Sequence, residues 1–140
     1  MTESIPPIRL TLTSPADPDR AWACLTDPER VSEWFTEATP VGSVGDPYRL
    51  DFGEGSIVEG VVLELDPGRR FVHSWAWADA EPRQETTVSW LVEALATGGV
   101  RVVLEHAGWA EAGSDEAARD DHEAYWSGYL DDLAALLSEA

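Results

Sequence analysis

The sequence predicts an α+β domain in which a curved antiparallel β-sheet wraps around a long C-terminal helix, with two short helices after the first strand. From Tyr48 to His106, apolar runs follow one another with only short glycine- and proline-rich breaks, a pattern typical of an antiparallel meander. From Asp115 to Glu139 there is no proline, and apolar residues recur at helical spacing. Since the sheet offers the largest apolar surface, the helix is expected to pack across it.

The beginning of the chain is predicted to be a strand followed by two short helices. Ile8–Leu12 alternates between apolar and polar residues, as a half-buried strand does. Asp17-Pro18 and Asp27-Pro28 each join a side chain that caps a helix to a proline suited to the first helical turn. A short helix is therefore expected after each pair, and the second helix should end near Trp34-Phe35.

The middle of the chain is predicted to form five consecutive strands, and the tail one long helix. The expected strands are Tyr48–Phe52, Ser56–Leu65, Phe71–Ala78, Glu85–Val92 and Val100–His106. Ser56–Leu65 is apolar on both faces, so a β-bulge is expected there. Ser114 is the expected N-cap of the helix. The apolar stripe of this helix is predicted to consist of His122, Trp126, Tyr129, Leu133, Leu136 and Leu137.

Length and composition indicate one folded domain over residues 1–140, with a core from about residue 8 to residue 137. The 140 residues are 44% hydrophobic, which is enough to fill a core. The chain has no internal repeat and no break in composition. Both observations favour one continuous core.

The charge of the chain excludes two classes of partner. Asp and Glu number 27, the nine basic residues are all arginine, and the net charge is -18. Such a surface repels the phosphates of nucleic acids and the headgroups of anionic membranes. The N-terminus lacks a signal-peptide pattern, no apolar run is long enough to span a bilayer, and Cys24 is the single cysteine. We therefore expect a cytoplasmic protein.

Four stretches of the sequence resemble one known family. They are Ala21–Pro28, Trp34-Phe35, Gly60–Trp75 and Thr86–Trp109, the last with the His-x-Gly sequence at His106. Their order resembles the helix-grip fold of the START/Bet v 1-like (SRPBCC) superfamily, and in particular the subgroup related to the C-terminal domain of the activator of Hsp90 ATPase. The resemblance implies a cavity between the sheet and the long helix, which relatives use for lipids, hormones or polyketides. It implies no shared catalytic motif.

Aromatic and histidine side chains are the candidates for lining this cavity. Seven tryptophans and three histidines occur in the chain. Strand parity places His73, Trp75 and Trp77 on one face, and tryptophan combines a large apolar ring with an N–H that needs a partner when buried. The candidate ligand-binding residues are Trp34, Phe35, His73, Trp75, Trp77, Trp90, His106, Trp109, His122, Trp126 and Tyr129.

The sequence contains no recognisable catalytic or cofactor motif. The histidines lack the spacing of a zinc site, the glycines lack that of a dinucleotide fingerprint, and there is no lysine for a phosphate-binding loop. Neither a metal nor a cofactor is expected. Cys24 is predicted to be a small buried apolar residue in the first helix rather than a nucleophile.

Three functions are consistent with these observations. The favoured one is a cytoplasmic protein that binds a small hydrophobic or aromatic molecule in the cavity, as a monomer or homodimer. The first alternative is a protein-interaction module of the co-chaperone or stress-adaptor type. The second is a cyclase- or hydrolase-type enzyme, which would need the histidines to lie within hydrogen-bond reach of a carboxylate or hydroxyl group.

Overall fold

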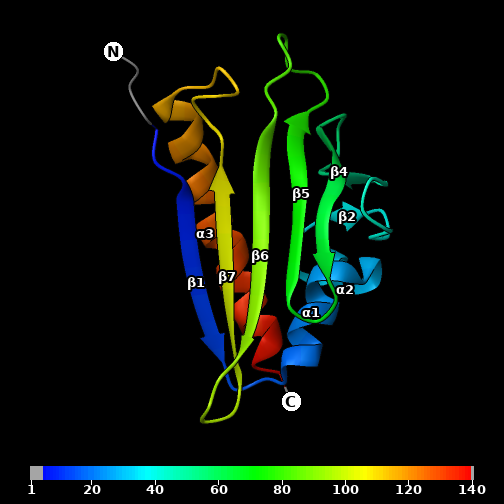
Figure 1. Ribbon diagram of the computed structural model, residues 1–140, viewed down its shortest axis with the longest axis vertical. Coiled ribbons are helices and arrows are strands. Elements are labelled where there is room, and N and C mark those ends of the chain that lie inside the picture. The colour runs from blue at the N-terminus through cyan, green and yellow to red at the C-terminus, as the bar shows by residue number, and fades with distance from the viewer. Residues whose placement is uncertain (1–4, 140) are drawn as a thin grey trace.

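The described part of the protein is a seven-stranded antiparallel sheet with three helices packed against one face, which is the predicted architecture with one strand more (Figure 1). The computed structural model describes residues 5–139. The elements are, in chain order, β1 (Ile8–Ser14), α1 (Pro18–Thr26), α2 (Pro28–Trp34), β2 (Glu37–Ala38), β3 (Pro47–Asp51), β4 (Ile57–Asp66), β5 (Arg70–Trp77), β6 (Thr86–Ala94), β7 (Val100–Ala107) and α3 (Glu116–Leu137). The strand order is β1-β7-β6-β5-β4-β3-β2.

The sheet is a meander from β2 to β7 that β1 completes at the opposite edge. Each neighbouring pair is antiparallel, and β1 pairs along its whole length with β7, from Ile8 opposite His106 to Ser14 opposite Val100. The two-residue strand β2 is absent from the prediction because a segment this short carries no alternation. Figure 1 shows α3 behind β1, β7 and β6, and the two short helices behind the other half of the sheet.

Aspartate side chains begin all three helices. Asp17 accepts a hydrogen bond from the Asp19 amide at 2.9 Å, and Asp27 accepts one from the Glu29 amide at 3.1 Å, as predicted. The predicted cap of α3, Ser114, is wrong by one residue. Asp115 has the extended backbone of an N-cap, and its carboxylate accepts from the Ala118 amide at 2.9 Å.

Strand β4 contains the predicted bulge and one close backbone approach. Its register against β5 shifts between Val62 and Glu64. Gly60 faces the Ser74 carbonyl so closely that a Cβ atom there would lie 2.0 Å from the oxygen. A residue without a side chain is therefore required at Gly60.

The long helix α3 buries a narrow stripe against the concave face of the sheet. The buried residues are Trp126, Leu130, Leu133 and Leu137. The predicted stripe omitted Leu130 and included His122, Tyr129 and Leu136, which are only partly buried. The stripe is correct in its centre, and the partly buried residues lie at its margins.

Two arginines fix the ends of α3 to the rest of the fold. Arg20 of α1 donates to the carbonyls of Leu136 and Glu139, at 2.8 and 2.5 Å. At the other end, Arg119 donates to the carbonyls of Pro6 and Pro7, both at 3.1 Å. These bonds satisfy the last carbonyls of α3 and hold its first turns beside the segment before β1.

Candidate functional site

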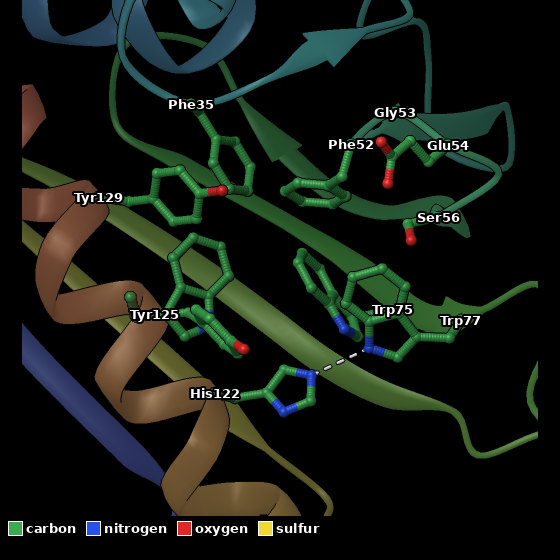
Figure 2. Close-up of a pocket in the computed structure, with 11 residues that line it drawn as sticks. Phe35, Phe52, Gly53, Glu54, Ser56, Trp75, Trp77, His122, Tyr125 and Tyr129 are labelled. Atoms are coloured by element: carbon green, nitrogen blue, oxygen red, sulfur yellow. Dashed lines mark hydrogen bonds between the residues drawn. The ribbon is translucent and has the colours of Figure 1, made fainter.

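A cavity of about 360 Å³ opens between α3, β5, the end of α2 and the β3–β4 turn. Figure 2 shows the side chains of these four segments converging on it. The residues that line it are Phe35, Phe52, Gly53, Glu54, Ser56, Trp75, Trp77, His122, Tyr125, Trp126 and Tyr129. The cavity lies where the resemblance implied one, between the sheet and the long helix.

Six of the predicted candidates line this cavity: Phe35, Trp75, Trp77, His122, Trp126 and Tyr129. The residues of the β3–β4 turn and the exposed Tyr125 line the cavity but were not among the candidates. Of these residues, Phe52 was the one whose inward direction the sequence could have indicated, because it shares the strand parity of the buried Tyr48 and Leu50. The turn residues carry no periodicity, so only the folded chain places them at the mouth.

The other five candidates lie elsewhere, in the core. Trp34 and Trp90 pack edge-to-face at 6.0 Å, and the Trp34 indole donates to the Cys24 carbonyl at 2.7 Å. His73 is in the sheet interior. The rings of His106 and Trp109 are in contact, with centroids 4.3 Å apart and planes tilted by 39°, and the Trp109 indole donates to the His106 carbonyl at 2.9 Å.

The aromatic rings around the cavity face it from several directions. Phe35 is nearly perpendicular to Tyr129, at 4.8 Å and 80°, and Trp75 is perpendicular to Trp77, at 5.8 Å and 89°. Phe52 connects these pairs, at 5.4 Å from both Phe35 and Trp77. Because neighbouring rings are turned through such large angles, the cavity surface consists of ring faces as well as ring edges.

His106 is held in a single tautomer by a chain of hydrogen bonds. The Trp126 indole, which can only donate, lies 3.0 Å from Nδ1 of His106. The other ring nitrogen, Nε2, therefore carries the proton and donates to Oγ1 of Thr86 at 2.7 Å. The Thr86 hydroxyl donates in turn to the Trp75 carbonyl at 3.2 Å. Helix α3 is thus joined to β7, β6 and β5 through one neutral imidazole.

A second indole–imidazole bond runs in the opposite direction between sheet and helix. The Trp77 indole of β5 donates to Nε2 of His122 on α3 at 3.0 Å, drawn as the dashed line in Figure 2. Nδ1 of His122 donates to the Ala118 carbonyl one helical turn earlier, at 2.7 Å. Both nitrogens are engaged only in the neutral form, so His122 brings no positive charge to the cavity.

Burial keeps all three histidines neutral. It lowers the pKa of His73 from 6.5 to about 4, although a hydrogen bond to the Ser74 carbonyl opposes the shift. Burial also lowers the pKa of His106 well below its usual value, with smaller contributions from His122 and His73. For His122, burial lowers the pKa, and the Ala118 carbonyl and Asp121 oppose it. The hydrogen-bonding partners of these imidazoles are indoles, a hydroxyl and backbone carbonyls.

The mouth of the cavity is formed by a tight turn that presents a carboxylate. The Ser56 amide donates to the Gly53 carbonyl at 2.9 Å. The two residues between them have positive φ, 53° at Glu54 and 83° at Gly55, as in a type I′ turn. Glu54 is unusual at such a position, where glycine, asparagine or aspartate is favoured. Figure 2 shows its carboxylate near Phe52, across the cavity from Tyr125 and His122.

A second, much smaller cavity of about 40 Å³ adjoins the first. Trp75, Trp77 and His122 line both, and Thr86 and Trp109 line the smaller one only. The smaller cavity has room for at least one water molecule. The Trp77–His122 hydrogen bond therefore lies between the two cavities.

Three further features of residues 5–139 bear on function. Cys24 is 1% exposed in α1 and burial raises its pKa, so the prediction that it is a buried residue of the first helix is confirmed. Within residues 5–139, no three His, Cys, Asp or Glu side chains are grouped to hold a metal ion. No helix in that range is long and apolar enough to cross a membrane.

Comparison with known proteins identifies relatives over nearly the whole chain. The family described as activator of Hsp90 ATPase homolog 1-like protein matches residues 15–138. No curated protein matches. Among solved structures, DynU16, from the dynemicin biosynthetic locus, has a TM-score of 0.82 at 25% identity and covers 94% of this chain. Only 46% of DynU16 is covered, so this chain spans about half its length.

Two bacterial structures match over their full lengths. MLL2253 from Mesorhizobium loti has a TM-score of 0.84 at 19% identity, covering 94% of this chain and 96% of its own. The Aha1 dimer from Colwellia psychrerythraea has a TM-score of 0.78 at 22% identity, covering 95% and 96%. At these identities the two structures establish the fold.

Proposed function

The chain belongs to the family of activator of Hsp90 ATPase homolog 1-like proteins, and on this premise we propose that it is a cytoplasmic protein that binds a small aromatic molecule reversibly in the α3 cavity. The observation that carries the proposal is the lining of that cavity. Seven of the residues that line it have aromatic side chains: Phe35, Phe52, Trp75, Trp77, Tyr125, Trp126 and Tyr129.

The size and openness of the cavity support a small-molecule ligand. Its volume of about 360 Å³ lies at the lower end of the range for ligand pockets, roughly 300–1,000 Å³. An aromatic ligand would bury its faces against the partly exposed rings of the lining, such as Phe52 and Trp77, and such burial contributes about 25 cal/mol per Å². Aromatic pairs contribute about 0.5–1.5 kcal/mol beyond that area term.

The hydrogen bonds of the histidines support binding rather than catalysis. His106 and His122 each use both ring nitrogens within the protein, and His73 lies outside the cavity. For either engaged imidazole to take a proton, an indole N–H would have to give up its acceptor. A general base needs a free nitrogen within reach of the substrate.

A protein-interaction module is the second candidate, and one surface feature favours it. Val61 and Leu63 are 39% and 42% exposed on the outer face of β4, away from the core. The Colwellia relative is described as a dimer. A second copy of this chain, or another protein, would cover these side chains, and sedimentation velocity would detect the self-association.

The proposal is tested with N-phenylnaphthylamine, a neutral aromatic probe whose fluorescence rises when it leaves water. We expect saturable binding to the wild type. The Ser56→Trp variant should lose at least about tenfold in affinity, because the new indole occupies the cavity mouth where Ser56 now lies. Ser43→Trp is the matched control, since Ser43 is exposed in a loop and does not line the cavity. Equal affinity in both variants, or no binding to the wild type, would contradict the proposal.

A further inference from the structure

We infer that the α3 cavity selects a positively charged aromatic molecule, one that carries a quaternary ammonium or protonated amine next to its ring. This inference rests on the proposed function and specifies its ligand class. Three features of the cavity point in the same direction: the orientation of its rings, the sign of its charged lining, and the neutrality of its imidazole.

The first feature is the set of ring faces. The face of an aromatic ring is electronegative, and Trp attracts cations more strongly than Tyr or Phe. Trp75 and Trp77 lie at 89° to each other, and Phe52 is tilted by 44° from Trp77 and by 60° from Trp75. A cation placed among these three rings would lie against electronegative ring faces on more than one side. Sites that recognise quaternary ammonium groups surround the cation with aromatic rings in this way.

The second feature is the charge at the mouth. Among residues 5–139, Glu54 is the one formally charged side chain that lines the cavity, and no arginine lines it. All nine basic residues are arginines, and in the described part of the chain the six ion pairs outside the helices join arginines to acids that do not line the cavity. A cationic group would therefore meet an unpaired carboxylate, whereas an anionic ligand would meet a carboxylate of its own sign and no arginine.

The third feature is His122. Its Nε2 accepts from Trp77 and its Nδ1 donates to the Ala118 carbonyl. The imidazole is therefore uncharged and cannot offset Glu54. The net charge of -18 adds a long-range attraction for cations. The attraction between the rings and a cation acts only at short range. Salt should therefore weaken the long-range attraction of the net charge much more than the attraction of the rings.

The test uses two ligands of the same shape that differ in charge. Naphthyltrimethylammonium and tert-butylnaphthalene differ only in having nitrogen or carbon at the centre of the branched group. Each is titrated against the complex with N-phenylnaphthylamine, in low and high salt. We expect the cation to displace the probe at about tenfold lower concentration than its neutral counterpart, and a clear preference should persist in high salt. Naphthalenesulfonate, an anion, should be the weakest competitor.

Matched charge variants locate the effect. Glu54→Gln should weaken binding of the cation about threefold and leave the neutral ligand unchanged. Glu93→Gln removes the same charge near the end of β6, where Glu93 pairs with Arg101 and does not line the cavity, and should change neither affinity. Equal losses in both variants would overturn the inference, because net charge alone would then explain the preference.

The ligand inference and the proposed function fail in different ways. If both naphthalene ligands displace the probe equally, or the neutral one displaces it better, the cation inference is overturned and the aromatic cavity stands. If the probe itself does not bind, the proposed function fails first.

Discussion

Replacing Trp126 is the most informative perturbation of this fold, because that side chain both fills the core and makes a defined hydrogen bond. It is 2% exposed and contacts Phe35, Trp75 and Trp90 at ring distances of 5.2, 5.3 and 5.6 Å. Its indole donates to Nδ1 of His106, which is fully buried. Trp126→Ala removes both contributions at once.

The magnitude follows from these two contributions. Truncating a buried aromatic residue to alanine typically costs about 3–5 kcal/mol. Leaving a buried acceptor without a donor costs about 1–3 kcal/mol more. We therefore expect Trp126→Ala to lower the free energy of unfolding by at least about 4 kcal/mol. Trp126→Phe keeps most of the packing and loses the N–H, so it should cost about 2–3 kcal/mol.

Urea unfolding followed by far-ultraviolet circular dichroism measures these losses without relying on tryptophan emission. Tyr125→Ala is the neighbouring control, because Tyr125 is 69% exposed and should cost less than about 0.5 kcal/mol. The double variant of Trp126→Phe with His106→Leu should cost less than the two single changes together, since both lose the same bond. A loss below about 1 kcal/mol for Trp126→Ala would show that this face of α3 is not packed on the sheet.

Two further predictions concern stability. Gly60→Ala should cost about 1–3 kcal/mol, because its Cβ would lie 2.0 Å from the Ser74 carbonyl oxygen, whereas Gly128→Ala, with no atom in the way on α3, should stabilise by about 0.5–1 kcal/mol. Urea unfolding of both variants checks this, and a stable Gly60→Ala would contradict the close approach. Acid should destabilise the protein through His73: its pKa is 6.5 when unfolded and about 4 when folded, so the unfolded state binds more protons between these values, and stability falls as pH drops from 6.5 to 4. The full contribution is about 3 kcal/mol. Unfolding free energies compared across this range should fall less steeply for His73→Leu than for the wild type, and parallel curves would refute the assignment.

The fold could be predicted because its determinants are local or periodic. The Asp-Pro pairs at residues 17 and 27 specify helix starts by themselves, and strands β6 and β7 show their faces through alternation. The bulge in β4 was predicted from the loss of a clear phase, and the structure confirms it between Val62 and Glu64. Where two capping side chains stand together, as at Ser114 and Asp115, the sequence does not decide between them.

The candidate site was less predictable because it depends on which buried rings reach the open side of α3. Trp75 and Trp90 share the concave face, yet only Trp75 reaches the cavity, because Trp34 and Trp126 cover Trp90. Glu54 stands in a turn whose sequence carries no sign of a neighbouring helix. The residues of this turn reach the site because β3 and β4 pair with each other in an antiparallel register, which sets the position of the turn between them.

The central claim, that the α3 cavity binds a small aromatic molecule, is tested most directly by proton–nitrogen correlation NMR during titration with N-phenylnaphthylamine. Each of the seven indoles gives its own N–H resonance. We predict that the indoles of Trp75, Trp77 and Trp126 shift in a saturable way, because they line the cavity. Trp22, which does not line it, should stay unchanged. Saturation with no shift at those three indoles, or with shifts confined to backbone amides around Val61 and Leu63, would contradict the account.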